Sequence, residues 1–146
     1  MSRIKIDLPG KFSFSTLIPV RITDVNYGNH VGNDAVLSII HEARMRYLGS
    51  FGYTELNFGG VGMIMKDVGI EFKTELFYGD SVIASVASSG FTKVSFDLYY
   101  KLEKEMAGHR KTVAVAKSAM VCYDYSQKKI VAVPEGALAR LNAEPD

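Results

Sequence analysis

Thr23–Asp34, with the sequence TDVNYGNHVGND, is the stretch that decides how this chain folds, and a long amphipathic helix follows it directly. The stretch places the Asp24 carboxylate at the end of a strand-like segment, before a loop of turn-forming residues. The start of a helix presents unpaired backbone N–H groups and a partial positive charge. A carboxylate that faces a helix start can attack a carbonyl carbon, or activate water against it, while the N–H groups hold the developing oxyanion.

The helix is predicted to be apolar around about half of its circumference. The apolar positions are Val36, Leu37, Ile39, Ile40, Ala43, Tyr47, Leu48 and Phe51. Asn33 and Asp34 are expected as N-cap residues, and Gly49 and Gly52 mark the end of the helix. So broad an apolar arc favours a helix wrapped by a curved sheet over one that rests on a flat surface.

The rest of the chain is predicted to form strands. Residues 93–102 alternate strictly between apolar and polar, which is the strongest strand signal. Val61–Lys73 is also strand-like, but its apolar phase changes near Lys66-Asp67, which predicts a bulge or a change of face. Further strands are expected at Phe14–Thr23 (where Pro19 requires an edge or a bulge), Ser81–Ser88, Lys111–Tyr123 and Ile130–Val133, with a last helical turn at Pro134–Leu141. Short connections favour antiparallel neighbours, so we expect a strand, a long helix and then an antiparallel meander.

Length and composition indicate one ordinary globular domain spanning residues 1–146. The net charge of +1 gives no electrostatic reason to expect nucleic acid or an anionic membrane as a partner. No stretch approaches the roughly 18 apolar residues of a membrane span, and we see no signal peptide, so a cytoplasmic location is expected. Cys122 is the only cysteine, and His41 and His109 lack the spacing of a metal site, so no disulfide framework and no metal are expected.

The residues around the opening stretch also match a known family pattern. Asp24, His30, Val31 and Asn33, followed by Glu42-Ala43-Arg44, fall in register with D-x-D-x-x-G-H-V-N-N-x-x-Y and a later E-A-R. This arrangement resembles the 4-hydroxybenzoyl-CoA thioesterase-like acyl-CoA thioesterases, which have the hotdog fold. The resemblance extends over nearly the whole chain, through residues 72–80 and a last hairpin at 124–134. The chain departs from the family pattern at Asn26, Asn29, Gly32 and Val36, which stand where the family usually has an acid, Gly, Asn and Tyr.

The resemblance implies an α+β hotdog domain, in which a curved antiparallel sheet of about five to six strands wraps a long central helix. It also implies a homodimer or a homotetramer with the site between protomers. The expected reaction is hydrolysis of an acyl-CoA thioester to a carboxylic acid and free coenzyme A. Coenzyme A belongs to the substrate, and no cofactor is expected.

The resemblance assigns catalysis to Asp24, as a general base toward water or as a nucleophile. The alternative for Asp24 is an Asx-turn or a cap to the backbone. His30 either donates a hydrogen bond near the thioester or shapes the loop. The backbone N–H groups of Val31 and Gly32 are the candidates for holding the thioester oxygen, and loss of one such donor typically costs about 3 kcal/mol of transition-state stabilisation.

Other residues have weaker grounds as substrate ligands. These are Asn26, Tyr27, Asn33, Arg44 and Lys93. Their alternatives are a turn residue for Asn26, a loop cover for Tyr27, a helix cap for Asn33 and a solvated strand face for Lys93. Arg44 lies within the apolar arc, so it either bonds carbonyl groups or a carboxylate, or anchors a protomer interface. Glu42, on the polar face of the helix, is a reserve catalytic carboxylate.

Two other functions stay open at this point, while a hotdog dehydratase is disfavoured because those enzymes normally pair a His with a helix carboxylate in a different motif. An acyl-carrier-protein thioesterase would use the same chemistry, and a basic docking surface around the tunnel mouth would point to it. A non-catalytic acyl-CoA-binding or sensing module would bind the thioester without cleaving it.

Overall fold

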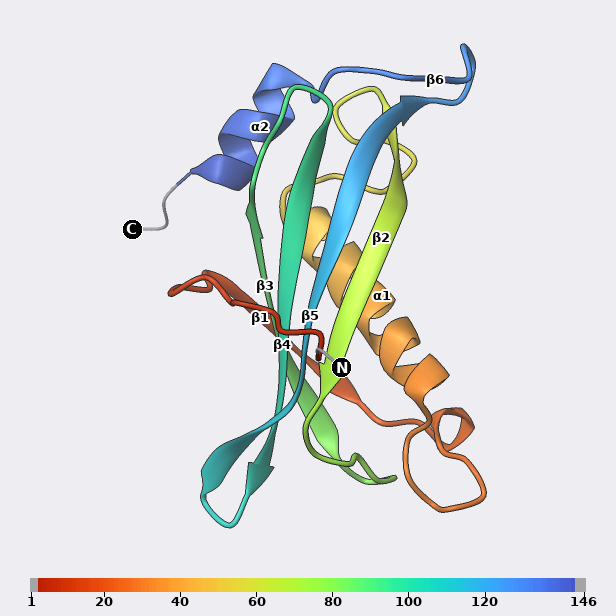
Figure 1. Cartoon of the computed structure of the whole chain (residues 1–146), viewed down its shortest axis with the longest axis vertical. Helices are drawn as coiled ribbons and strands as arrows, with labels where there is room; N and C mark the ends of the chain where they lie inside the picture. The colour runs from red at the N-terminus through yellow and green to blue at the C-terminus, as the bar shows by residue number, and fades with distance from the viewer. Residues whose placement is uncertain (1–2, 144–146) are drawn as a thin grey trace.

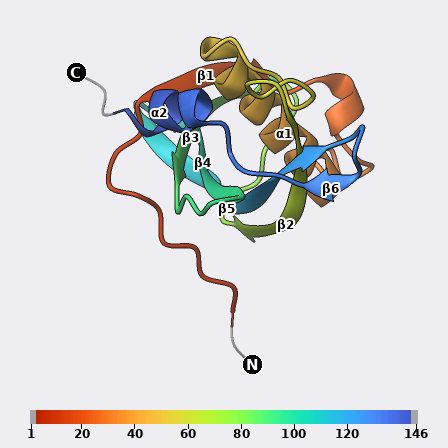
Figure 2. The same ribbon diagram turned by 90° about the horizontal axis from the view of Figure 1, so that it is seen from above.

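The computed structural model describes residues 3–143, in which a six-stranded antiparallel sheet curls around one long helix (Figures 1 and 2). The elements in chain order are β1 (Phe14–Pro19), the 3-10 turn η1 (Ile22–Asp24), α1 (Asn33–Ser50), β2 (Gly62–Phe72), β3 (Ser81–Ser89), β4 (Ser95–Met106), β5 (His109–Asp124), β6 (Lys129–Ile130) and α2 (Glu135–Asn142). The predicted α+β architecture, with a helix wrapped by a curved sheet, is confirmed. Within the described range, no helix is long and apolar enough to cross a membrane.

The strands lie in the order β1-β3-β4-β5-β2, with β6 paired to β5. The predicted meander is therefore right for β3, β4 and β5 but wrong for β2. Residues 62–72 of β2 pair with the far side of β5, from Gly62 opposite Tyr123 to Phe72 opposite Ala114. The reason is the helix: after β1 the chain crosses the concave side of the sheet as α1, emerges at the opposite edge as β2, and returns to pair beside β1 as β3.

The first strand is shorter than predicted. It ends at Pro19, which pairs with Ser81 on an edge strand, where a proline is tolerated. The following residues form η1, so Asp24 lies in a 3-10 turn and not at the end of a strand. The bulge expected near Lys66-Asp67 is confirmed by the register shift between Met65 and Asp67.

The start of α1 also differs from the prediction. Gly32 is the N-cap residue, and Asn33 and Asp34 are the first two helical residues, so the cap assignment to those two is wrong. The backbone shows why the helix begins there. The N–H groups of Ala35 and Val36 both donate to the carbonyl oxygen of Gly32, at 3.1 Å each.

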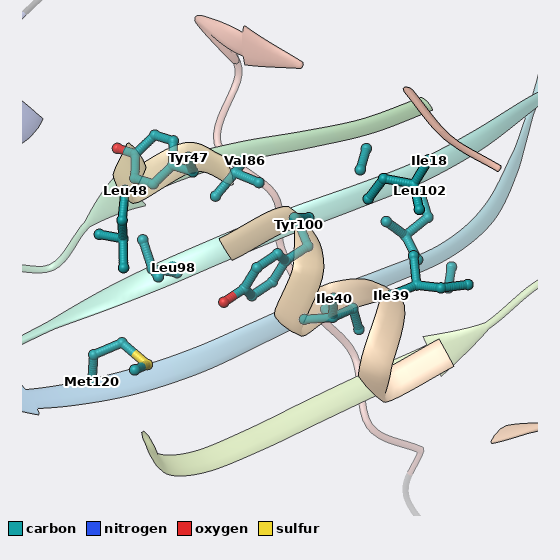
Figure 3. Close-up of a cluster of buried hydrophobic side chains, with 14 of the residues drawn as sticks. Ile18, Ile39, Ile40, Tyr47, Leu48, Val86, Leu98, Tyr100, Leu102 and Met120 are labelled. Carbon is teal, nitrogen blue, oxygen red and sulfur yellow. The ribbon is translucent and has the colours of Figure 1, made fainter. Parts of the chain in front are cut away.

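The core fills the space between α1 and the concave face of the sheet (Figure 3). Alternate residues of a strand face the same side, and Phe96, Leu98, Tyr100 and Leu102 of β4 form one fully buried row. The buried row of the neighbouring β5 includes small residues, namely Ala114, Ala116, Ser118 and Cys122. A large row beside a smaller one lets the helix lie close to the sheet.

A polar cluster interrupts this apolar core. The Arg44 guanidinium donates to the Tyr100 hydroxyl at 3.2 Å, and its Nε lies 3.4 Å from Glu55 Oε1. The Tyr100 hydroxyl is also 2.8 Å from Ser118 Oγ. Arg44 is buried, and Glu55 is the carboxylate that such a buried cation needs as a partner. The structure therefore supports the interpretation in which Arg44 bonds a carboxylate within its own chain. Burial raises the pKa of Tyr100, which keeps its hydroxyl neutral near physiological pH.

We expect Tyr100→Phe to lower the free energy of unfolding by about 1–3 kcal/mol, because Arg44 and Ser118 each lose a buried partner. The pKa of Tyr100 in the folded protein lies above the ordinary value of 10.0, which applies to the unfolded chain. Below pH 10 the neutral hydroxyl therefore makes its full contribution to the free energy of unfolding. Above pH 10 the Tyr100 hydroxyl ionises in the unfolded chain before it ionises in the folded protein. Its contribution to the free energy of unfolding therefore falls as the pH rises toward the pKa of the folded state. The difference between wild type and variant should therefore narrow above pH 10. Urea titrations at neutral and alkaline pH measure both effects.

Tyr99→Phe is the matched control, because Tyr99 is the preceding residue of β4, points to the opposite face and has no side-chain hydrogen bond within residues 3–143. Equal free energies of unfolding for the two variants at neutral pH would contradict the role assigned to the Tyr100 hydroxyl.

Candidate active site

The Asp24 carboxylate is buried and held in one orientation by the residue that opens its own turn. Oδ2 accepts the backbone N–H of Arg21 at 2.8 Å, and Oδ1 lies 3.2 Å from Arg21 Nη2. Only 6% of Asp24 is exposed, whereas 68% of the Arg21 side chain is exposed. The hydrogen bond from the Arg21 backbone N–H to Asp24 is thus a fixed part of the turn. The contact with the Arg21 guanidinium involves an exposed side chain, and water can take its place at the carboxylate.

Asp24 lines a cleft of about 280 Å³ between β1 and the outer face of α1. The helix contributes Ser38, His41 and Glu42 to the same cleft. Glu42 forms the expected i,i+4 ion pair with Arg46, at 2.9 Å. His41 Nε2 lies 2.7 Å from Glu55 Oε1, a contact that sequence reasoning missed because Glu55 comes after the helix and has no spacing that links it to His41.

The loop between η1 and α1 is a compact turn. Asn26 Oδ1 accepts the N–H of Gly28 at 2.9 Å, and the Asn26 N–H donates to the carbonyl of His30 at 2.9 Å. Asn29 has a φ of 63°, a left-handed conformation that Asn tolerates better than most residues, so Asn can stand where the family usually has Gly. Asn26 is engaged as a turn residue, and the Tyr27 side chain is fully exposed.

The start of α1 offers free donors, but they lie two residues later than the predicted pair, Val31 and Gly32. The Val31 N–H donates to the carbonyl of Leu76 at 2.8 Å, so this group is already engaged. The Gly32 N–H makes a longer bond of 3.3 Å, to the carbonyl of Asp24. Within residues 3–143 the N–H groups of Asn33 and Asp34 have no acceptor, as is usual in the first turn of a helix.

The predicted site residues fall on two sides of the first helical turn. Asp24 and Glu42 share the first cleft, whereas His30, Val31 and Asn33 line a second cleft of about 290 Å³ beside Phe72–Leu76. The backbone joins the two sides through the bond between Gly32 and Asp24.

Two predicted ligands lie elsewhere. Lys93 lies in the connection between β3 and β4, at the end of the sheet opposite the start of α1 (Figure 1), so the structure does not bring it to Asp24 within one chain. Arg44 points into the core. Over residues 3–143, no group of three His, Cys, Asp or Glu side chains is arranged to hold a metal ion.

Comparison with known proteins gives this chain a family. The model of the thioesterase-like superfamily matches residues 20–141, and the chain therefore belongs to that superfamily. Comparison with curated proteins gives no match.

Solved structures with the same fold include several thioesterases. A thioesterase superfamily protein from Jannaschia sp. CCS1 is 17% identical, with a TM-score of 0.80 over 91% of this chain and 83% of that one. A 1,4-dihydroxy-2-naphthoyl-CoA thioesterase from Synechocystis is 19% identical, with a TM-score of 0.77 over 90% and 98%. A mutant 4-hydroxybenzoyl-CoA thioesterase in complex with 4-hydroxybenzoyl-CoA is 14% identical, with a TM-score of 0.80 over 88% and 98%. These likenesses establish the hotdog fold that the sequence predicts.

The one thiol of the chain lies in the core, away from both clefts. Burial raises the pKa of Cys122 to about 11, so at neutral pH almost none of it is the reactive thiolate. We expect a colorimetric disulfide reagent near pH 8 to label the native protein far more slowly than the protein unfolded in guanidinium. Fast labelling of the native protein would contradict this burial.

Proposed function

We propose that this member of the thioesterase-like superfamily hydrolyses an acyl-CoA thioester to a carboxylic acid and free coenzyme A. The observation that carries the proposal is the buried Asp24 carboxylate, fixed in a turn whose backbone contacts the start of α1 through Gly32. Family membership supports the reaction class, and a Thermus thermophilus thioesterase of the same fold is complexed with coenzyme A.

In the proposed mechanism the backbone bond from Arg21 orients Asp24 through Oδ2, and the substrate displaces the exposed guanidinium from Oδ1. In the general-base route, Oδ1 removes a proton from a water molecule, and the resulting hydroxide adds to the thioester carbon. In the nucleophilic route, Oδ1 attacks the thioester carbon directly and forms a mixed anhydride, which water then hydrolyses. The C–S bond breaks in either route, and the sulfur leaves as the thiol of coenzyme A. The N–H groups of Asn33 and Asp34, which have no acceptor within residues 3–143, hold the oxyanion, and His30 borders the cleft beside the same helix start.

A second protomer completes the proposed site. β2 lies at an edge of the sheet and is 11 residues long, with exposed apolar side chains that include Ile64 and Phe72. A long apolar edge strand favours pairing with another strand. Phe72 also borders the second cleft, so a partner joined along β2 would extend the wall of that cleft. We expect a homodimer of this kind, or a homotetramer of two such dimers, in the cytoplasm.

A panel of acyl-CoA and acyl-carrier-protein thioesters with a free-thiol readout tests the proposed reaction. Release of coenzyme A from at least one member supports it. Tight acyl-CoA binding without release would favour a sensing module. Cleavage of acyl-carrier-protein thioesters only would favour that alternative substrate.

We expect Asp24→Asn to lower kcat by about 100-fold or more with little change in KM, because the amide keeps the shape of the side chain but cannot take a proton or attack a carbonyl. Steady-state kinetics on the best substrate of the panel measure this. Asp97→Asn is the control, since Asp97 pairs with Lys117 on β4 and β5 and touches neither cleft. Near-wild-type turnover by Asp24→Asn would remove the catalytic assignment.

We expect Ile64→Lys to weaken the dimer by about tenfold, because a charge on an edge strand opposes pairing of two edges. Leu17→Lys is the matched control, since Leu17 is an exposed apolar residue of β1 at the opposite edge of the same sheet. Sedimentation velocity over a range of concentrations compares the two. Dissociation by Leu17→Lys alone would place the interface at β1 instead.

A further inference from the structure

We infer that Lys104 is a positioning residue for the proposed active site, because it holds the loop between β2 and β3 to which both ends of the Asp24 segment are bonded. We call residues 73–80 the β2–β3 loop. The inference rests on the proposed function for its catalytic consequence, but its structural consequence is measurable without any activity.

Lys104 is a cation in a place where a strand normally carries an apolar side chain. It continues the inward-facing row of β4 directly after Leu102, and only 5% of it is exposed. Its Nζ donates to the carbonyl of Glu75 at 2.7 Å and lies 3.1 Å from Asp80 Oδ2. The ammonium also lies 5.1 Å from the centre of the Phe77 ring, a distance at which the ring face attracts a cation. One side chain thus contacts the β2–β3 loop at three points.

The same loop is bonded to the chain on both sides of the catalytic turn. The carbonyl of Asp80 accepts the N–H of Val20 at 2.9 Å, just before η1. The carbonyl of Leu76 accepts the N–H of Val31 at 2.8 Å, just before α1, and His30 pairs with Phe77 in an antiparallel bridge. Figure 1 shows the lower ends of β2 and β3, the loop before α1 and the β4–β5 hairpin gathered at one end of the molecule.

The other anchors of the loop are backbone bonds and one apolar side chain, Leu76, which is 2% exposed. The N–H groups of Lys73 and Thr74 both donate to the carbonyl of Val113, which fixes where the loop begins. Asp80 Oδ2 accepts the N–H of Phe77 at 2.9 Å, which closes the loop on itself. The Leu76 side chain packs into the core, and Lys104 is the side chain whose polar contacts hold the loop on both sides of Leu76, at Glu75 and Asp80. Without Lys104, the carbonyl of Glu75 and the Asp80 carboxylate lose their shared cation, and the loop can shift with Val20 and Val31 attached.

A buried lysine is expensive to desolvate, and its two oxygen partners offset that expense only in this arrangement. A methionine of similar length would fill the same space without any need for partners. Replacement by Met should therefore leave the sheet intact and act on the loop. The kinetic effect should appear in kcat, since a small displacement of a catalytic group can lower the rate by about 100-fold while the substrate still binds.

The test compares Lys104→Met with Lys101→Met. Lys101 is the matched control because it is a partly exposed lysine of the same strand, and within the described residues it pairs only with Glu103. Backbone hydrogen exchange, followed by mass spectrometry over residues 20–36, is the first readout. We expect exchange there to rise by about tenfold in Lys104→Met and to stay at the wild-type rate in Lys101→Met. We expect kcat to fall by about 10- to 100-fold in Lys104→Met with KM changed by less than about threefold.

Wild-type exchange over residues 20–36 in Lys104→Met overturns the inference whatever its activity. So does a rise in exchange that is equally large over β3 and β4, because that result indicates global destabilisation. If the wild-type protein cleaves no thioester, the proposed function fails, and the exchange readout alone then decides whether Lys104 holds the β2–β3 loop in place. If Lys104→Met does not fold, Asp80→Asn tests the same contact from the other side: it keeps an oxygen for the Phe77 N–H but removes the charge beside Lys104. It should raise exchange over the same residues, and unchanged exchange there overturns the inference.

Discussion

A single sheet can bury a helix only if the sheet curls around it, and this requirement organises the rest of the structure. The helix has to be apolar over a wide arc, and the strands it faces have to leave room for it. The fully buried row of β4 supplies bulk, while Ala114, Ala116 and Ser118 of β5 supply space. Because α1 crosses the concave side, β1 and β2 end at opposite edges of the sheet. The start of α1 then lies at the end of the sheet where the β2–β3 loop connects the two strands.

Two cationic side chains lie on faces that are otherwise apolar in this arrangement, and each is paired with one carboxylate. Arg44 faces the sheet from α1 and meets Glu55, and Lys104 faces inward from β4 and meets Asp80. In both cases the carboxylate belongs to a segment outside the helices and long strands. A buried charge is costly to leave unpaired, so each pair restricts the position of the segment that carries the carboxylate. The same electrostatic rule thus fixes the segment after α1 and the loop beside its start.

Local patterns in the sequence predicted those features that depend on neighbouring residues. The apolar arc identified α1, the phase change at Lys66-Asp67 identified the bulge, and Asp24 stood out by its place before a helix. The pairing of β2 with β5 and the engagement of the Val31 N–H by Leu76 depend on residues far apart in the chain, and no local pattern carries them. Lys104 lies between these cases: extending the alternation of β4 by one step beyond Leu102 places it inside, but its partners appear only in three dimensions.

Three carboxylates lie at or near the outer face of α1, and their partners distinguish them. Glu55 accepts contacts from both His41 and the buried Arg44, so displacing it would strand a buried cation. Glu42 is bound to Arg46, which is itself tied to β1 through Thr16 and the carbonyl of Leu17. Asp24 has one oxygen fixed by its own turn and the other held only by an exposed side chain. Where the family pattern has a second acid, this chain has Asn26, whose amide oxygen is engaged in the turn. A mechanism with one carboxylate, acting through Asp24 Oδ1, is therefore the one that requires the smallest rearrangement of the folded protein.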